Sequence, residues 1–366
     1  MALGPAGVVI VGGGVAGSLL ALELRALGAA VTLIDGDPAE GTCSATAISY
    51  GVIPGWPLAA SPLARRSATA SRRWRALELR HGPLGWQSRR LRLHGSNRWL
   101  SWMARLGLLP LAQVDTRVLA QRLPVVLAQA GVERRRIRAE ALAPAAGGWI
   151  LQLSDGSGCK ADQLVLAAGA GCRQLWPALP GALRSSWAAV LELAAFPAAL
   201  GRPDALLPQG FARLALERGA ANLEKSDWVV DPGLVPWGRG ALVGQHTWIA
   251  AQGADAARPP AADRCEQQLR EELAACAEWL LDGTSRSAVL RQAAVAFSSS
   301  GAPLVGPVED APGLWLFTGF SGGFAQVPVL APLLAQRLAG SQQRADQAQR
   351  QLQQLGVWPQ GADSGH

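Results

Sequence analysis

The sequence is poor in the residues that build disulfide frameworks and metal sites. Its 366 residues include four histidines and only five cysteines, at positions 43, 159, 172, 265 and 276. The cysteines are odd in number, widely separated and without a CxxC pair, so we expect neither a disulfide framework nor a zinc or other metal site. Free cysteines of this kind favour a reducing compartment, and we expect a cytoplasmic protein.

Long hydrophobic runs are also absent. No stretch reaches about 18 apolar residues, so we predict no membrane span. The apolar N-terminus lacks a basic region and is interrupted by glycines, unlike a signal peptide. With 49% hydrophobic and 17% charged residues, the chain does not have a disordered composition. Its length exceeds the roughly 250–300 residues at which one core stops growing, so two domains are expected.

The positive charge is concentrated in one segment. The whole chain carries a formal charge of +7, whereas Ser61 to Pro110 holds eleven arginines and a single acid, Glu78. That segment carries +10 and the remainder −3. The Arg65–Arg105 segment suits an anionic partner, which would be nucleic acid, membrane headgroups or an acidic protein; the alternative is an ordinary solvated helix face. No nucleic-acid-binding motif accompanies it.

A β-α-β pattern opens the chain. Apolar runs at 8–11 and 31–34 are typical of strands buried on both faces, and a helical segment lies between them. The motif Gly12-x-Gly14-x-x-Gly17 joins the first strand to the helix. Gly12 permits a tight turn, Gly14 lets the backbone approach a pyrophosphate, and Gly17 allows close helix–strand packing. This context favours a dinucleotide-binding site over a turn without a ligand.

Two further features select the dinucleotide. Asp35 ends the second strand, where it is placed to accept a ribose hydroxyl, and this favours FAD or NAD over NADP. The stretch from Gly319 to Phe324 follows another buried strand and opens a helix. Its backbone N–H groups would support negative charge on a reduced flavin. An NAD dehydrogenase has no need of this second turn, so FAD is favoured.

The rest of the chain alternates between strand and helix patterns. Helices are expected at 61–80, 96–107, 115–130, 261–281 and 327–338, and strands at 88–94, 149–153, 163–168 and 314–318. The polar, glutamine-rich tail from residue 342 is expected to extend the last helix and then fray.

Together these segments resemble an FAD-dependent oxidoreductase of the D-amino-acid oxidase, glycine oxidase and sarcosine oxidase family. The matching stretches include VVIVGGGVAGSLLALELRALGAAVTLIDGD, GTCSATAISYGVI, ADQLVLAAGAGCRQL and GLWLFTGFSGGFAQVPVLAPLLAQRLAG. The resemblance implies an α/β fold, in which a discontinuous Rossmann-like FAD-binding domain is joined to a second α+β substrate domain built on an antiparallel sheet. The expected division is 1–60, 114–180 and 303–341 for the FAD-binding domain, 61–113 and 181–302 for the substrate domain, and 342–366 for a polar C-terminal helix and tail.

The resemblance also implies which residues contact the cofactor. They come from the two glycine-rich turns, the end of the second strand, the small-residue loop after it and the end of a later strand: Gly12, Gly13, Gly14, Val15, Ala16, Gly17, Asp35, Gly36, Ser44, Ala45, Thr46, Ala168, Gly169, Gly319, Phe320, Ser321, Gly322, Gly323 and Phe324. The flavin-linking cysteine of the sarcosine-oxidase type has no counterpart in its usual region, so we expect non-covalent FAD.

The substrate side departs from the family. Val295 stands where many members carry an arginine that binds the substrate carboxylate, and Arg291 would replace it only if the strand register slipped. Gln245, His246 and Ser299 are candidate substrate contacts, although His246 also suits a purely structural role.

The expected reaction is hydride transfer from the CH–NH bond of an amine or amino-acid-like small molecule to FAD. The alternatives are a hydroxy acid as the donor, or a flavin-binding partner subunit docked through the arginine-rich segment. Nothing in the sequence indicates an oligomeric state.

Overall fold

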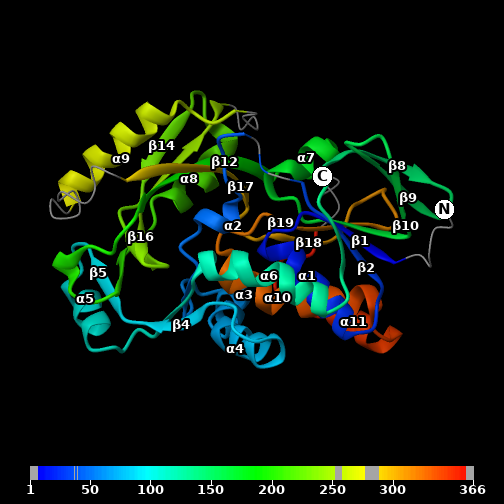
Figure 1. Cartoon of the computed structure of the whole chain (residues 1–366), viewed down its shortest axis with the longest axis horizontal. Coiled ribbons are helices and arrows are strands. Elements are labelled where there is room, and N and C mark those ends of the chain that lie inside the picture. The colour runs from blue at the N-terminus through cyan, green and yellow to red at the C-terminus, as the bar shows by residue number, and fades with distance from the viewer. Residues whose placement is uncertain (1–6, 37, 39, 252–257, 277–287, 360–366) are drawn as a thin grey trace, which may run out of the picture.

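The protein is built on two large sheets that lie side by side (Figure 1). The computed structural model describes residues 7–36, 38, 40–251, 258–276 and 288–359. One sheet is mostly parallel and the other mostly antiparallel, which confirms the predicted α/β class with an antiparallel second domain. No helix in the described ranges has the length and apolar character needed to cross a membrane.

The parallel sheet contains the predicted β-α-β unit. Its order is β18-β19-β11-β1-β2-β7, and its strands are β1 (Val8–Val11), β2 (Val31–Ile34), β7 (Glu133–Arg135), β11 (Gln163–Leu166), β18 (Leu304–Pro307) and β19 (Leu314–Thr318). All neighbours are parallel except β18 and β19. The central strands β1 and β19 are buried along their whole length, as expected of strands covered on both faces.

Different layers cover the two faces of this sheet. Helices α1 (Val15–Ala26), α6 (Thr116–Gln129) and α10 (Gly323–Ala339) lie below it in Figure 1 and share one hydrophobic core with it. A three-stranded sheet lies above and forms a second core cluster; its strands are β8 (Ala139–Ala145), β9 (Gly148–Leu153) and β10 (Gly158–Ala161). The parallel sheet is therefore enclosed between a layer of helices and the three-stranded sheet, and its strand ends lie between these two layers.

The C-terminal segment differs from the expectation that it extends the last helix. α10 ends at Gly340, which has extended backbone angles, and Ser341 is the N-cap of a separate helix, α11 (Gln342–Gln354). α11 packs back on α10 because Ala345, Ala348 and Leu352 are apolar on one face and buried. The end of the helix at Gly340 lets a second, polar helix turn back onto the core, and the expected fraying of the tail lies outside the described residues after 359.

The second domain is a seven-stranded sheet. Its order is β17-β12-β16-β15-β13-β5, with β14 also paired to β16; the strands are β5 (Leu91–His94), β12 (Leu183–Leu193), β13 (Ala205–Pro208), β14 (Asp227–Val230), β15 (Leu234–Trp237), β16 (Gly240–Ile249) and β17 (Val289–Ser298). Its neighbours are antiparallel except β5 and β13. α9 (Ala262–Cys276) packs on β16; the rest of the expected helix at 261–281 lies outside the described residues after 276.

One further small sheet and several helices complete the described fold. A small sheet is formed by β3 (Val52–Pro54), β4 (Trp86–Arg89) and β6 (Leu111–Val114), and the other helices are α2 (Ala45–Ile48), α3 (Pro62–Ser67), α4 (Ala70–His81), α5 (Arg98–Arg105), α7 (Cys172–Leu175) and α8 (Arg213–Gly219). α3 and α4 were expected in the second domain, but they share the core of the parallel sheet with α10.

Candidate cofactor site

A cavity of about 1110 Å³ opens where the parallel sheet meets the antiparallel one. Its walls include residues 11–16 after β1, 34–36 at the end of β2, 42–47 in the next loop and 167–171 after β11. This is the edge where the carboxyl ends of β1, β2 and β11 meet, which is the usual ligand site of an open α/β sheet. The cavity is larger than an ordinary drug-sized pocket of roughly 300–1,000 Å³.

The glycine-rich turn has the shape that the motif predicts. Gly12 has a φ of +112°, and a Cβ there would lie 2.4 Å from the carbonyl oxygen of Ala167. A Cβ at Gly17 would lie 2.0 Å from the carbonyl oxygen of Gly12, so α1 packs against the turn only with glycine at this position. The backbone at Gly14 thereby stays open to the cavity, with the Thr46 hydroxyl as its nearest neighbour.

The N-terminus of α1 lies in the wall of this cavity. The first N–H groups of a helix have no intrahelical acceptor and carry partial positive charge, and no acidic residue lies in the first turn of α1. Val15 N–H donates to the Thr46 Oγ1 at 3.0 Å, which anchors the small-residue loop beside the helix. A pyrophosphate fits this arrangement because the helix N-terminus offers partial positive charge, and the nearby Asp35 carboxylate is paired with Arg134.

Asp35 is ordered by two donors. Its Oδ1 accepts from Gly13 N–H at 2.9 Å, and its Oδ2 accepts from Nη2 of Arg134 at 2.9 Å. Arg134 lies on β7, beside β2, and its buried Nε has no hydrogen-bond partner within the described part of the chain. Sequence reasoning missed Arg134 because it lies 99 residues from Asp35; the run of arginines at 134–136 was its only local signal.

The small-residue loop connects the two domains. Ser44 caps α2 by accepting from Ala47 N–H at 3.2 Å. Cys43 N–H donates to the carbonyl oxygen of Gln292 on β17 at 2.8 Å, so the loop is tied to the antiparallel sheet. Burial raises the pKa of the Cys43 thiol, which lines the cavity together with Ser44, Ala45 and Thr46.

The far wall of the cavity comes from the second domain. Ser185 and Trp187 on β12 and Ala294 on β17 line the same cavity as Ala168 and Gly169. Trp187 is paired in register with Ala294, so the two side chains stand together on one face of the sheet. No sequence motif marks these residues, because their position depends on the pairing of strands more than 100 residues apart.

The predicted second turn lies beside the cavity and does not line it. The residues Gly319, Phe320, Ser321, Gly322, Gly323 and Phe324 are all absent from the cavity wall of the described structure. A Cβ added to Gly323 would lie 3.8 Å from Val15, which does line the wall. Phe324 is turned into the core, where its ring stacks on Trp74 with 5.8 Å between centroids.

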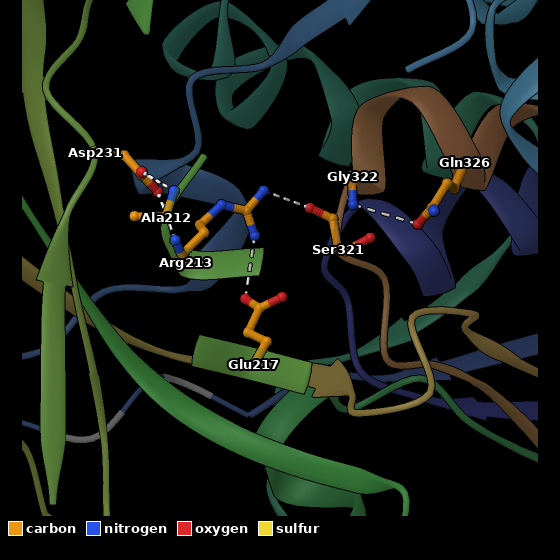
Figure 2. A network of polar contacts seen from close by, with 7 residues as sticks. All are labelled: Ala212, Arg213, Glu217, Asp231, Ser321, Gly322 and Gln326. Atoms are coloured by element: carbon orange, nitrogen blue, oxygen red, sulfur yellow. Dashed lines mark hydrogen bonds and ion pairs between the residues drawn. The ribbon is translucent and has the colours of Figure 1, made fainter. Parts of the chain in front are cut away.

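An arginine of the second domain holds this turn (Figure 2). Nη2 of Arg213 donates to the Ser321 carbonyl oxygen at 2.8 Å, and Nη1 pairs with Glu217 at 3.1 Å. Asp231 accepts the backbone N–H groups of Ala212 and Arg213, which fixes the start of α8. Burial raises the pKa of Glu217, and the nearby Arg213 guanidinium opposes the shift. A buried ion pair therefore stands against the turn.

The substrate candidates lie elsewhere, and none of them lines the cavity. His246 is fully buried, bonds to Gln268 of α9 through Nε2 at 3.0 Å, and stacks on Trp228; burial lowers its pKa. Ser299 donates to the Ala182 carbonyl oxygen, and Gln245 neighbours His246 on β16. His246 is therefore held within the second domain through Nε2 and its ring, while its buried Nδ1 has no hydrogen-bond partner in the described part of the chain.

The pairing of β12 with β17 shows that Arg291 does not take the place of Val295. The register runs without a shift from Leu183 opposite Ser298 to Glu192 opposite Val289. Val295 consequently faces the apolar cluster around Ile48, and Arg291 pairs with Glu192 at 2.8 Å.

The mostly parallel sheet, the glycine-rich turn and the large cavity at the strand ends define a protein of the dinucleotide-binding class. A comparison with protein-family models matches residues 7–113 and 107–337 to the FAD dependent oxidoreductase family. The chain belongs to this family. A comparison with curated protein sequences finds no match.

Solved structures share the fold over nearly the whole chain. Glycine oxidase from Geobacillus kaustophilus is 17% identical, with a TM-score of 0.66 and coverage of 91% of this chain and 94% of its own. Iminodiacetate oxidase from Chelativorans sp. BNC1 is 21% identical, with a TM-score of 0.64 and the same coverages of 91% and 94%. L-proline dehydrogenase from P. horikoshii is 12% identical, with a TM-score of 0.64 and coverages of 97% and 99%.

Proposed function

We propose that this chain binds FAD non-covalently and oxidises a CH–NH bond of an amine or amino-acid-like small molecule. The observation that carries the proposal is the cavity at the ends of β1, β2 and β11, with the glycine-rich turn and the N-terminus of α1 in its wall. FAD, when bound, supplies an acceptor for the hydride of the substrate C–H bond.

The residues of the cavity suggest how the cofactor is held. The backbone from Gly12 to Ala16 would face the pyrophosphate, and Asp35, already ordered by Arg134, would accept a ribose hydroxyl. Thr46 and Ala168 lie along the wall toward the second domain. Among the described cysteines, Cys43 lines the cavity, and we expect its thiol to form no bond with the flavin.

The second domain would orient the substrate and exclude water. Trp187 and Ala294 form a wall that is polar only at Ser185, so the bound molecule would meet a mostly apolar surface. Because Val295 offers no cation and Arg291 pairs with Glu192, a carboxylate would not be bound at that strand. The named activities of glycine oxidase, iminodiacetate oxidase and proline dehydrogenase support an amine or amino acid as the substrate class.

The proposal is tested by anaerobic reduction of the purified, FAD-loaded protein. A panel of primary and secondary amines, amino acids and hydroxy acids is added, and the visible absorbance of the oxidised flavin is followed, with free FAD as the control. We expect amines or amino acids to bleach the absorbance. Bleaching by hydroxy acids alone would favour the alternative donor. Flavin that no member of the panel reduces would favour a flavin-binding partner subunit.

Non-covalent binding has its own measurement. The protein is denatured and filtered, and we expect the flavin to pass through the filter. Flavin retained on the polypeptide would contradict the proposal and make Cys43, in the cavity wall, the candidate for its attachment.

We also propose a reducing, cytoplasmic location. Cys43, Cys159, Cys172 and Cys265 are free in the structure. Trapping of these thiols in freshly lysed cells would find them reduced if the proposal holds.

A further inference from the structure

The surface around α5 exposes large apolar side chains. Trp99, Trp102, Leu106 and Leu108 are 63%, 46%, 55% and 56% exposed. Trp99, Trp102 and Leu106 are spaced three and four residues apart, so they stand on one helix face, and the two indole rings stack at 4.7 Å between centroids. Single exposed apolar residues are ordinary, whereas several on one short helix and the turn after it indicate an interaction site.

The same surface is positively charged. Arg98 and Arg105 of α5 are exposed, and the exposed Arg90 donates to the Arg105 carbonyl oxygen at 3.3 Å. No acidic residue occurs between Gly95 and Pro110. Among the described residues, no carboxylate pairs with Arg98 or Arg105. We call the residues Arg90, Arg98, Trp99, Trp102, Arg105, Leu106 and Leu108 the α5 surface.

The combination of side chains restricts the partner. Tryptophan prefers the boundary between lipid headgroups and acyl chains, and arginine beside it pairs with anionic headgroups. A second copy of the chain fits less well, because a two-fold contact would set the cations of the α5 surface against themselves. A nucleic acid would use the arginines and stack on the indoles, but the aliphatic Leu106 and Leu108 offer it nothing.

We propose that the α5 surface docks the protein on an anionic lipid bilayer, with Trp99, Trp102, Leu106 and Leu108 inserted at headgroup depth and the arginines on the phosphates. α5 follows the edge strand β5 and lies at the end of the molecule away from α1 and β1 (Figure 1). None of the residues of the α5 surface lines the cofactor cavity. Docking would therefore leave the cavity accessible, whatever substrate the protein binds.

Sedimentation of the FAD-loaded full chain with lipid vesicles tests the proposal. We expect the protein to sediment with mixed phosphatidylcholine–phosphatidylglycerol vesicles and to stay in solution with phosphatidylcholine alone or in high salt. Arg98→Gln with Arg105→Gln should weaken binding about 30-fold. Trp99→Ser with Trp102→Ser should weaken it about tenfold or more.

Matched variants on α4 provide the controls. Arg72→Gln with Arg73→Gln removes the same charge from another exposed part of the arginine-rich segment, and Leu79→Ser replaces an apolar side chain that is 89% exposed. Both should bind vesicles as the parent does. All variants should keep the flavin content and circular dichroism of the parent, which separates lost docking from lost folding.

Several results would overturn the proposal. One is a parent protein that does not sediment with the anionic vesicles. A second is equal weakening by the α4 and α5 arginine changes, which would make the effect one of net charge. A third is vesicle binding that needs the arginines but tolerates the loss of both tryptophans; this would mean attraction to the headgroups without insertion of the α5 surface.

Discussion

At the scale of single residues, Arg213 connects the second domain to the turn at Ser321, and its pairing with Glu217 makes the contact sensitive to substitution. The side chains of Arg213 and Glu217 are 17% and 6% exposed. Arg213→Gln would leave a buried carboxylate without its cation, and we expect a loss of about 3–5 kcal/mol in the free energy of unfolding. Adding Glu217→Gln should restore part of it. Denaturant unfolding of the single and double variants measures both values.

Arg291→Gln is the matched control. Its pair with Glu192 is more open, with side-chain exposures of 43% and 19%, so the loss should stay below about 1 kcal/mol. Equal losses at Arg213 and Arg291 would show that burial does not distinguish the two pairs.

The burial of Glu217 also leads us to expect a free energy of unfolding that depends on pH. Burial raises its pKa above the ordinary 4.5, so the folded state binds this proton more tightly than the unfolded state. Its contribution favours folding below pH 4.5 and is lost as the pH rises through the folded-state pKa. The unfolding free energy of the parent, minus that of Glu217→Gln, should therefore fall as the pH rises above 4.5. Asp231, whose pKa burial also raises, is common to both proteins. A difference that grows with pH would refute this assignment.

At the scale of elements, the pairing of β2 with β7 places Arg134 beside Asp35 and so fixes the position of its carboxylate. Asp35→Ala removes the acceptor of both Gly13 N–H and Arg134 and leaves the arginine unpaired in the cavity wall. We expect the Kd for FAD to rise about 10- to 100-fold, the value of one or more hydrogen bonds to a charged group. Titration of the apoprotein with FAD, followed by flavin fluorescence, measures the change. Asp155→Ala, in an exposed turn, should leave the Kd unchanged.

The elements also show what the sequence could and could not reveal. The β1–α1 turn was predictable because Gly12, Gly14 and Gly17 act through contacts within a few residues of one another. Arg134 and Trp187 were not, because strand pairing across long stretches of chain brings them to the cavity. The separate α11 was missed for a local reason: the tail is polar overall, and the apolar face that packs on α10 consists of the three residues Ala345, Ala348 and Leu352.

At the scale of the whole molecule, the cavity lies between two domains, and the reactivity of the Cys43 thiol can show whether FAD is bound there. Cys43 lines the wall, and its backbone N–H bonds to Gln292 on β17, so the thiol sits at the junction of both sheets. FAD bound in this cavity would cover it. We therefore expect FAD to slow the alkylation of Cys43 by a maleimide about tenfold or more, since only protein with an open cavity reacts.

The other cysteines make this measurement specific. Cys172 is fully buried and does not itself line the cavity, and burial raises its pKa to about 11, so it should react only on unfolding, with or without FAD. Peptide mapping by mass spectrometry reads the two sites in one sample. Protection of Cys43 with no change at Cys172 would mean that the cofactor occupies the junction. If Cys43 reacts equally fast with and without bound FAD, the cofactor lies elsewhere and the assignment of this cavity fails.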